Sequence, residues 1–251
     1  MNIQDSTALV TGANRGIGKA FADALLDRGA AKVYAAVRDV TTVTDPRLVP
    51  IQLDVTDPDR VAAVARELDD VQVVVNNAGV LHVAVPLSAT LDVARVELET
   101  NYLSLVTMTQ AFAPVLEHNG GGAFVNVLSV FSCVATPLIT TYSASKAAAW
   151  SFTNAARIEL RRQGTQVVGV HAGPVDTDMA ARFDFEKIPP AIVATSALDA
   201  LEASEPEAVV DDYSRAIKAG LSDDQEALYP QIEREFLAIA GAGTTATGGN
   251  Q

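Results

Sequence analysis

The sequence predicts an α/β fold, built as a single doubly wound parallel sheet with helices on both faces. Two observations support this prediction. Short runs rich in Val, Ile and Leu alternate with helical stretches from the first residues onward. Most of these runs are largely apolar, which is typical of strands buried on both faces of a parallel sheet. Right-handed crossovers between the strands then wind the sheet in both directions.

Seven segments have the length, the β-branched content and the flanking turn residues of strands. The connection across Asp39–Pro46 is β-branched and ends in proline, so we expect a loop or a single turn there instead of a helix. The strands are expected at Thr7–Val10, Lys32–Val37, Val49–Leu53, Val71–Val75, Phe124–Leu128, Gln166–Val170 and, as a short last strand, Glu207–Val210.

Helices are expected where apolar residues recur with the helical period. The first one shows the pattern, because Ile17, Phe21 and Leu25 share one face of the segment that follows the first strand. The full set is Gly16–Arg28, Asp59–Leu68, Asp92–Glu117, Tyr142–Arg162, Tyr213–Ala219 and Asp224–Ile239.

The alternation of strands and helices fades after Gly173. Residues 174–196 contain two adjacent prolines and few helix signals, so we expect a substrate loop there. Residues 241–251 are rich in Gly, Ala and Thr, lack core-forming residues and are expected to be disordered. Because no linker divides the chain, residues 1–240 are predicted to form a single domain.

The charge balance argues against nucleic-acid and membrane partners. The chain has 18 Lys and Arg against 31 Asp and Glu, a formal net charge of -13. Such a surface repels nucleic acid and anionic membranes, so a phosphate-bearing ligand needs a local basic clamp. One cysteine, Cys133, excludes an internal disulfide. With neither a signal peptide nor an apolar stretch of about 20 residues in view, we expect a cytoplasmic protein.

A phosphate-binding loop is indicated by Thr11–Gly18, which places Gly12, Gly16 and Gly18 between the first strand and the first helix. Glycines let the backbone turn sharply and approach a pyrophosphate, whose charge then meets free N–H groups at the helix N-terminus. Three glycines alone are weak evidence. Their position after the first strand of an α/β alternation predicts dinucleotide binding on a Rossmann-type fold.

The Gly-x-x-x-Gly-x-Gly spacing of this loop resembles that of the short-chain dehydrogenase/reductase family, in its shorter, non-extended branch. Asn76–Gly79 matches the second motif of that family. The resemblance implies that the domain predicted for residues 1–240 both binds a nicotinamide dinucleotide and carries the catalysis. The residues implied at the cofactor are Gly12, Asn14, Arg15, Gly16, Ile17, Gly18, Asp54, Val55, Asn77, Ala78 and Gly79.

The end of the second predicted strand favours NADP(H) over NAD(H). An NAD-binding strand normally ends in an acid that accepts hydrogen bonds from the ribose hydroxyls. Here that position is Val37, followed by Arg38, whose guanidinium suits a 2′-phosphate. Arg15, in the glycine loop, could approach the same phosphate. The alternative is that Asp39 serves an NAD ribose, which a one-residue shift of the strand at Ala30–Ala31 would allow.

Tyr142 and Lys146 lie four residues apart at the start of a predicted helix, so their side chains share one face. A free tyrosine has a pKa near 10, too high for efficient proton abstraction at neutral pH. A fixed positive charge nearby, aided by a nicotinium ring, favours the phenolate and lowers that pKa. The pair therefore predicts Tyr142 as proton donor and acceptor, with Lys146 also placed to hold the nicotinamide ribose.

The resemblance adds two further catalytic residues. Ser129 matches the family serine that hydrogen-bonds the substrate carbonyl, and Ser132 is a weaker substitute because it falls beyond the strand end. Asn101 matches the residue that distorts its helix locally and holds a water in the proton relay. The resemblance thus implies an oxidoreductase, a carbonyl reductase or alcohol dehydrogenase that transfers hydride between NADP(H) and a ketone, aldehyde or secondary alcohol. No metal is expected, because the three histidines, His82, His118 and His171, lack ligand spacing.

Gly173–Thr177 resembles the family segment that holds the nicotinamide carboxamide, which implies cofactor contacts from Gly173, Val175 and Thr177. The family usually has Pro-Gly where this chain has Ala172–Gly173, which weakens the expectation of a rigid loop. Apolar pocket walls would suit an apolar or aromatic carbonyl substrate, although packing in the core is an equal alternative for each of them. The candidate pocket residues are Cys133, Leu138, Ile139, Met179 and Phe183.

Other functions stay open. A non-catalytic NADP-binding sensor would be expected to have lost the tyrosine, lysine or serine, and all three are present. An epimerase or dehydratase of the extended branch would have another glycine spacing and a larger C-terminal domain. A reductase of carrier-bound β-ketoacyl thioesters is compatible with the motifs, but an acidic surface suits an acidic carrier poorly. The chain lacks the Val-Asp-Gly-Gly motif of tetrameric relatives, so a monomer and a smaller homo-oligomer both stay open.

Overall fold

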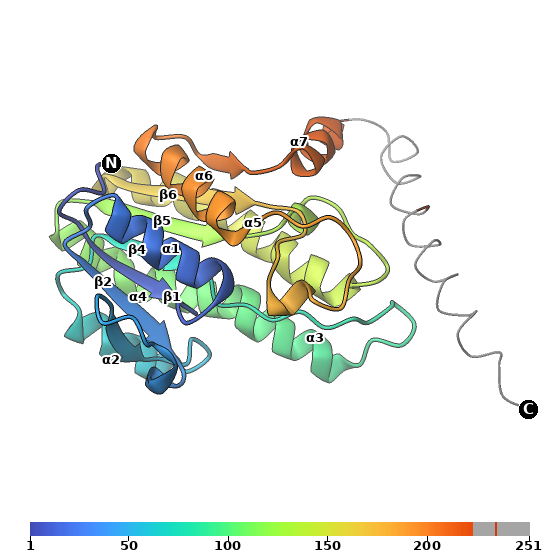
Figure 1. Cartoon of the computed structure of the whole chain (residues 1–251), viewed down its shortest axis with the longest axis horizontal. Helices are drawn as coiled ribbons and strands as arrows, with labels where there is room; N and C mark the ends of the chain where they lie inside the picture. Colours follow the sequence, from blue (N-terminus) through green and yellow to red (C-terminus); the bar gives the residue numbers. More distant parts are fainter. Residues whose placement is uncertain (223–233, 235–251) are drawn as a thin grey trace, which may run out of the picture.

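In the computed structural model of this chain, residues 1–222 and 234 are described, and Figure 1 shows how their elements are arranged. The helix predicted at Asp224–Ile239, apart from residue 234, lies outside the described residues. The tail predicted at 241–251 lies outside them as well.

Seven strands form one sheet, in the order β3-β2-β1-β4-β5-β6-β7. Every neighbouring pair runs parallel, which confirms the predicted doubly wound α/β fold. The strand order reverses between β1 and β4, and sheets of this kind bind ligands in the crevice at the carboxyl ends of those two strands. The strands are β1 (Thr7–Thr11), β2 (Lys32–Val37), β3 (Val49–Gln52), β4 (Val73–Asn76), β5 (Gly122–Val127), β6 (Thr165–His171) and β7 (Glu207–Val209).

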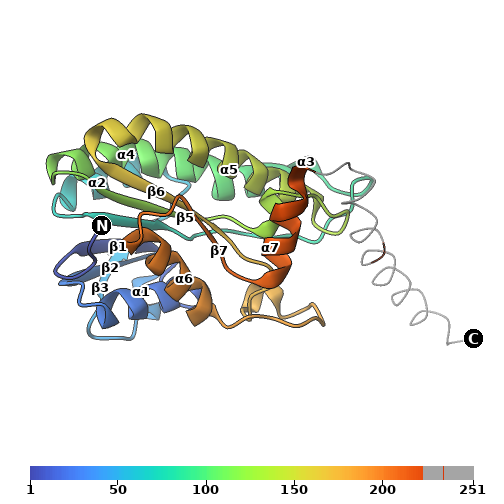
Figure 2. The same ribbon diagram turned by 90° about the horizontal axis from the view of Figure 1, so that it is seen from above.

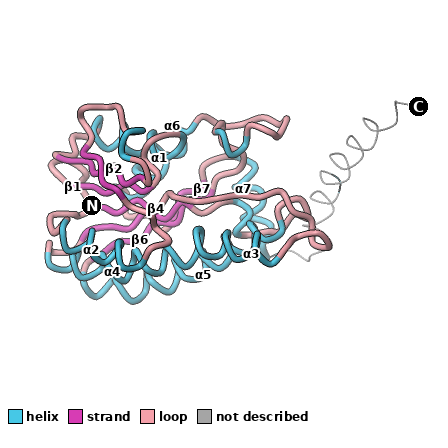
Figure 3. Tube along the Cα trace, turned by 90° about the horizontal axis from the view of Figure 1, so that it is seen from below, coloured by secondary structure: helices cyan, strands magenta, loops and turns pink. Residues whose placement is uncertain are grey.

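Helices cover both faces of the sheet, as the views in Figures 2 and 3 show. α1 and α6 pack on one face, over a buried cluster that includes Phe21 and Leu198. α2, α4 and α5 pack on the other, over a cluster that includes Phe112 and Phe124. Each face therefore has its own apolar core, which the burial of the strands on both sides requires. The helices are α1 (Gly16–Asp27), α2 (Pro58–Glu67), α3 (Leu91–Leu98), α4 (Ser104–His118), α5 (Thr140–Leu160), α6 (Pro190–Glu202) and α7 (Asp212–Ala219).

The helix predicted at Asp92–Glu117 consists of three consecutive parts: α3, a π-helical segment at Glu99–Leu103, and α4. A π-helical turn widens the helix locally, and such turns are frequent at functional sites. The segment contains the buried Asn101. The local distortion thus falls at the residue for which the family resemblance implied one.

The prediction of a loop over residues 174–196 is wrong for its last seven residues, because α6 begins at Pro190. Proline breaks a helix interior but is favoured in the first turn, where its missing N–H has no partner to lose. Apolar residues then recur every four positions along α6, on the face that packs on the sheet. Of these, Val193, Ala197 and Leu201 are fully buried. The irregular segment therefore spans residues 174–189, with one short turn at Asp178–Ala180. Between β2 and β3 the structure has a single turn, as predicted.

Within residues 1–222, no helix combines the length and the apolar content that a bilayer crossing requires. Nor does the described part of the chain bring three His, Cys, Asp or Glu side chains together as a metal site would. The histidines lie apart: His171 is buried at the end of β6, whereas His82 and His118 are exposed.

Candidate active site

The glycine loop between β1 and α1 has the backbone shape of a phosphate cradle. Gly12 and Gly16 have φ values of +67° and +54°, a left-handed conformation that favours glycine. Gly18 must be small, because a Cβ atom there would lie 2.2 Å from the Gly12 carbonyl oxygen. The N-cap of α1, Arg15, makes no side-chain hydrogen bond to the helix, so the first N–H groups of α1 can face an anion.

The Asn76–Gly79 motif is hydrogen-bonded to Thr11, the residue before Gly12 of this loop. The Thr11 hydroxyl accepts hydrogen bonds from the backbone N–H groups of Asn77 and Ala78, at 2.9 and 3.0 Å. The Asn77 side-chain amide donates to the Thr11 carbonyl at 2.8 Å. These bonds join the carboxyl ends of β1 and β4 at the point where the strand order reverses.

The π-helical segment places Asn101 against the end of this motif. Its Oδ1 accepts a hydrogen bond from the Val80 N–H, and its Nδ2 donates to the Val80 carbonyl and to the Ser145 hydroxyl, each at 2.9 Å. A Cβ atom on Gly79 would lie 3.1 Å from Asn101 Oδ1 and 3.7 Å from Lys146 Nζ. Asn101 and Lys146, which are far apart in the sequence, therefore flank the same glycine.

Tyr142 and Lys146 are both buried in the first two turns of α5. The Lys146 Nζ lies 5.8 Å from the centre of the Tyr142 ring and donates to the Val127 carbonyl at 2.8 Å. Ser129, two residues beyond Val127, has its side chain near enough to the Tyr142 hydroxyl to act on the pKa of the phenol as a hydrogen-bonding group. The Ser132 hydroxyl instead donates to the Ser129 carbonyl at 2.6 Å. Of the two candidate serines, Ser129 is thus the one in contact with the tyrosine.

Burial dominates the electrostatics of this group. It raises the pKa of Tyr142 to about 12, opposed by the Ser129 hydrogen bond and reinforced by the nearby charge of Glu97. It lowers the pKa of Lys146 to about 8. Both shifts have one cause, the cost of holding a charge in the low-dielectric interior. The pKa of Tyr142 thus shifts in the direction opposite to the lowering that we predicted from the charge of Lys146, because burial outweighs it. At neutral pH the Tyr142 phenol carries its proton, which is the form that can act as an acid.

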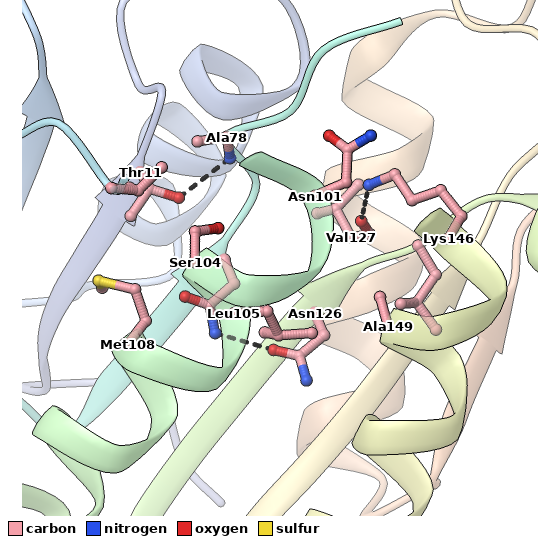
Figure 4. A pocket seen from close by; sticks show the side chains of 13 residues that line it. Thr11, Ala78, Asn101, Ser104, Leu105, Met108, Asn126, Val127, Lys146 and Ala149 are labelled. Atoms are coloured by element: carbon pink, nitrogen blue, oxygen red, sulfur yellow. Dashed lines mark hydrogen bonds between the residues drawn. The ribbon is translucent and has the colours of Figure 1, made fainter. Parts of the chain in front are cut away.

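A cavity of about 20 Å³ lies beside Lys146, between the ends of β4 and β5 and the helices α4 and α5 (Figure 4). That volume is roughly what one water molecule needs. Asn101, Ser104, Asn126 and Lys146 are among the residues that line it. The side-chain oxygen of Asn76, another lining residue, is buried with no hydrogen-bond partner in the described part of the chain. A polar wall with an unpaired acceptor suits a water molecule.

The end of β2 has the register from which we predicted an NADP site. Val37 is its last residue and is buried, and the exposed Arg38 follows directly. Within residues 1–222 the Arg38 side chain makes no hydrogen bond or ion pair, although its charge contributes to the lowered pKa of the nearby Asp54 carboxylate. Its N–H groups are therefore available to a ligand. Asp39 is already engaged: its carboxylate accepts hydrogen bonds from the Thr41 hydroxyl and N–H, at 2.6 and 3.0 Å, which lower the pKa of Asp39.

Arg15, the second predicted phosphate ligand, has a partner within the chain. Its guanidinium forms an ion pair with Asp178 at 2.8 Å, and both side chains are exposed. Asp54 and Val55 follow β3, with Val55 buried. Hydrogen bonds from the N–H and hydroxyl of Thr56 lower the pKa of Asp54 and hold its carboxylate in place.

The segment after β6 lies against the glycine loop. A Cβ atom on Gly16 would lie 3.2 Å from the Thr177 methyl group, so the two predicted cofactor-binding segments are in contact. The Gly173 N–H donates to the Asp211 carboxylate at 2.8 Å, which fixes the start of the segment from the direction of α7. Val175 is buried.

The predicted pocket residues differ in their environments. Ile139 is buried and pairs with Ala84 in an isolated β-bridge, whereas Met179 is 40% exposed. The Phe183 ring stacks on Phe185 with the ring centres 5.3 Å apart. Leu138 lies beside the same bridge, where its carbonyl accepts a hydrogen bond from the Ala84 N–H. Cys133 packs in a small apolar cluster with residues of α7.

Sequence reasoning misses Glu97, a fully buried acid that acts electrostatically on Tyr142. Glu97 Oε1 accepts a hydrogen bond from the His82 N–H at 2.7 Å. Glu97 Oε2 is buried and has no hydrogen-bond partner among the described residues. One signal could have found it, because Glu97 lies four residues before Asn101 and residues at that spacing share a helix face.

Comparisons with known proteins agree with this geometry. A family model described as short chain dehydrogenase matches residues 6–187. Estradiol 17-beta-dehydrogenase 2 of Rattus norvegicus is 32% identical over 199 residues, 72% of this chain but 51% of the rat protein, so the chain spans about half the length of that relative. The 3-oxoacyl-acyl-carrier-protein reductase of Vibrio cholerae is 30% identical over 196 residues, 74% of this chain and 80% of that protein.

A solved structure is similar over nearly the whole chain. The short chain dehydrogenase from Burkholderia cenocepacia, in complex with NADP, is 39% identical and superposes with a TM-score of 0.88. The match covers 92% of this chain and 99% of the Burkholderia chain.

Proposed function

The chain belongs to the short-chain dehydrogenase family, and from this premise we propose that it transfers hydride between NADP(H) and a carbonyl compound. In one direction a ketone or aldehyde is reduced, and in the other an alcohol is oxidised. The observation that carries the proposal is the proximity of the Ser129 hydroxyl to the Tyr142 phenol, with Lys146 on the same helix face as Tyr142. Two neighbouring hydroxyls can both donate a hydrogen bond to one carbonyl oxygen.

The residues of the crevice fit a nicotinamide dinucleotide phosphate. The close approach of Gly18 to the Gly12 carbonyl leaves no room for a side chain, as expected of the third glycine of a dinucleotide-binding turn, where the helix packs closely on the end of the strand. Arg38, directly after β2, offers a guanidinium that makes no hydrogen bond or ion pair within residues 1–222, at the place where a 2′-phosphate would lie. The similar Burkholderia protein was solved in complex with NADP, which supports the same choice here. When bound, NADPH supplies the hydride.

Tyr142 and Ser129 act on the substrate oxygen in this proposal. The Tyr142 phenol, protonated at neutral pH, gives its proton to the oxygen as negative charge develops there. The Ser129 hydroxyl donates a hydrogen bond to the same oxygen and stabilises that charge. Because both hydroxyls are already held in contact and buried, little reorganisation is needed when the substrate arrives.

Lys146 and Asn101 return the proton to Tyr142. The lowered pKa of Lys146, about 8, lets its ammonium group release a proton near neutral pH. Asn101 is fixed by three hydrogen bonds and lines the water-sized cavity beside Lys146. A water held there would connect the Lys146 ammonium to the Asn101 amide.

A second candidate function is reduction of a β-ketoacyl thioester on a carrier protein. The similarity to the Vibrio cholerae 3-oxoacyl-acyl-carrier-protein reductase favours it. The formal net charge of -13 opposes it, because an acidic carrier would be repelled. A purely sensory role is opposed by the presence of all four groups, Ser129, Tyr142, Lys146 and Asn101.

The test follows the oxidation of NADPH and NADH by the purified chain against a panel of ketones, aldehydes and a β-ketoacyl carrier thioester. We expect turnover of a free carbonyl with NADPH, much weaker turnover with NADH, and loss of turnover in Tyr142→Phe. Turnover of the carrier thioester alone would favour the second candidate. Binding of NADPH without reduction of any compound on the panel would contradict the proposed activity.

A further inference from the structure

A buried histidine adjoins Ser129 on the next strand. His171, the last residue of β6, is 1% exposed. Its Nδ1 lies 3.2 Å from the Ser129 carbonyl oxygen and 3.1 Å from the Ser132 hydroxyl. Its Nε2 lies 3.3 Å from Glu207 Oε1. The imidazole thus bridges the catalytic serine and a carboxylate on β7.

The partners of the ring show where its protons are. A carbonyl oxygen can only accept, so the Ser129 carbonyl calls for an N–H at Nδ1. The Ser132 hydroxyl has a single hydrogen, which it donates to the same carbonyl at 2.6 Å, so toward His171 it too can only accept. On the other side, a carboxylate calls for an N–H at Nε2. With the Ser132 hydroxyl donating to the carbonyl, both ring nitrogens of His171 are donors, which is the imidazolium form. The alternative is a neutral ring, in which the Ser132 hydroxyl donates to Nδ1 instead.

Glu207 is held as a carboxylate by several donors. Besides His171, it accepts a hydrogen bond from the Trp150 indole N–H at 3.0 Å and forms an ion pair with Lys218 on α7. These bonds, of which the one from His171 is the largest effect, lower the pKa of Glu207. A protonated carboxyl that would let His171 be neutral is therefore excluded at neutral pH.

The charged groups that face His171 come from three elements. Burial by itself lowers the pKa of His171, but the bonds to Cys133 and Glu207 outweigh it and the pKa is raised. Cys133, in the turn after β5, places its sulfur 3.7 Å from Nδ1. Lys218 on α7 opposes the positive charge of the ring, and Arg157 on α5 adds positive charge near Glu207.

The same cluster is linked to the helix that carries Tyr142 and Lys146. Trp150 lies four residues after Lys146, so these side chains share one face of α5. The Trp150 ring also packs edge-on against the His171 ring, with the centres 5.6 Å apart. Glu207 therefore contacts both His171, which bonds the Ser129 carbonyl, and Trp150, which belongs to α5.

We propose that His171 is a positioning residue for Ser129: held as an imidazolium between the Ser129 carbonyl and the Glu207 carboxylate, it keeps the serine hydroxyl against Tyr142. The inference rests on the proposed function, in which Ser129 addresses the substrate oxygen. It assigns His171 no contact with the substrate. Its effect is on the orientation of the serine and therefore on turnover.

The protonation state is tested without any turnover, by NMR of the full chain with nitrogen-15-labelled histidine. His82 and His118 are exposed and give the other two histidine signals. We expect the third signal, identified by its absence in His171→Asn, to show two protonated ring nitrogens at pH 7. Glu207→Gln should lower the pH at which this signal becomes neutral. A neutral His171 at pH 7 in the wild type would overturn the proposal.

The positioning role is tested with two substitutions that each keep one half of the imidazole. Asn places an amide N–H near the position of Nδ1 and can still donate to the Ser129 carbonyl. Gln reaches the position of Nε2 and can donate only to Glu207. With one hydrogen bond lost to the serine, we expect kcat for carbonyl reduction to fall about tenfold in His171→Gln and by less than about threefold in His171→Asn. The KM for NADPH should not change in either variant.

Equal losses in both variants, or losses confined to the KM for NADPH, would show a role in packing alone and overturn the proposal. Circular dichroism of both variants identifies a variant that has not folded, and in that case the NMR titration of the wild type decides. If the wild type reduces no carbonyl at all, the proposed function fails. The NMR titration then still decides whether His171 is an imidazolium.

Discussion

Arg15, in the glycine loop, and Asp178, in the segment after β6, form an ion pair at 2.8 Å. Their side chains are 70% and 75% exposed, so solvent screening limits the stabilisation to roughly 0–1 kcal/mol. The pair nevertheless joins two segments that would both contact the cofactor. A 2′-phosphate that attracts the Arg15 guanidinium competes with Asp178, so binding of the phosphate and release of Asp178 are coupled.

We expect Asp178→Asn to tighten the binding of NADPH, because Arg15 then has no competing partner. A pair of this strength corresponds to a decrease in Kd of up to about fivefold. The measurement is a fluorescence titration with NADPH and, in parallel, with NADH, whose Kd should stay unchanged. Asp176→Asn is the matched control, since it removes the same charge two residues away. An equal effect of both substitutions would point to net charge alone instead of to this ion pair.

Arg38→Ala tests the cofactor preference directly. Loss of a charge-assisted hydrogen bond to the phosphate should raise the KM for NADPH about tenfold or more, with the KM for NADH little affected. Asp39→Ala is the companion variant, because Asp39 is the residue that would hold an NAD ribose in the alternative interpretation. Its carboxylate is already bonded to Thr41, so we expect no change in the KM for NADH. The opposite pattern, with NADH turnover lost in Asp39→Ala, would make the chain an NAD enzyme.

Tyr142→Phe should abolish most of the turnover while leaving the cofactor site intact. General acid catalysis by a positioned side chain contributes roughly 10²–10⁴-fold, and kcat should fall by that factor. Phenylalanine keeps the ring in its buried position, so the fold and the Kd for NADPH should be preserved. Single-turnover kinetics with saturating NADPH make the comparison, and near-normal turnover would remove Tyr142 from the mechanism.

The pH dependence of the two directions should differ. Burial raises the pKa of Tyr142 to about 12, so the phenol needed for carbonyl reduction persists through neutral pH. Alcohol oxidation needs the phenolate, and its rate should therefore rise with pH. Glu97→Gln removes a charge that raises this pKa, so the rise should begin at lower pH. Asp92→Asn, at the exposed start of α3, is the control and should leave both pH profiles unchanged.

Much of the fold follows from the sequence because the strands are buried on both faces. β2 shows this best: its apolar run, Lys32–Val37, has the same bounds in the prediction and in the structure. This agreement also gives Arg38 its place at the end of the strand. α6 is not predicted because Pro189 and Pro190 look like a loop in isolation. Only the burial of the helix against α1 and β6 shows that Pro190 begins a helix.

In the site too, contacts between residues close in the sequence could be predicted, and contacts between distant residues could not. Tyr142 and Lys146 could be predicted together, because four residues along a helix bring side chains to one face. His171 and Glu207 could not, because 36 residues separate them and only the pairing of β6 with β7 brings them together. In the sequence, each looks like an isolated polar residue. Ser132 also contacts His171, and not Tyr142. That contact likewise depends on the fold and could not be predicted from the sequence.

Gly18→Ala tests whether the shape of the glycine loop is required for cofactor binding. The new Cβ atom would lie 2.2 Å from the Gly12 carbonyl oxygen, a backbone atom that cannot move without reshaping the loop. We therefore expect the affinity for NADPH to be lost. Gly120→Ala is the matched control: no atom lies within 4 Å of its Cβ position, but its φ of +82° makes any side chain strained, by about 1–2 kcal/mol. That variant should lower the Tm and still bind NADPH. Binding at wild-type affinity by Gly18→Ala, measured by the same fluorescence titration, would mean that this loop is not the phosphate cradle.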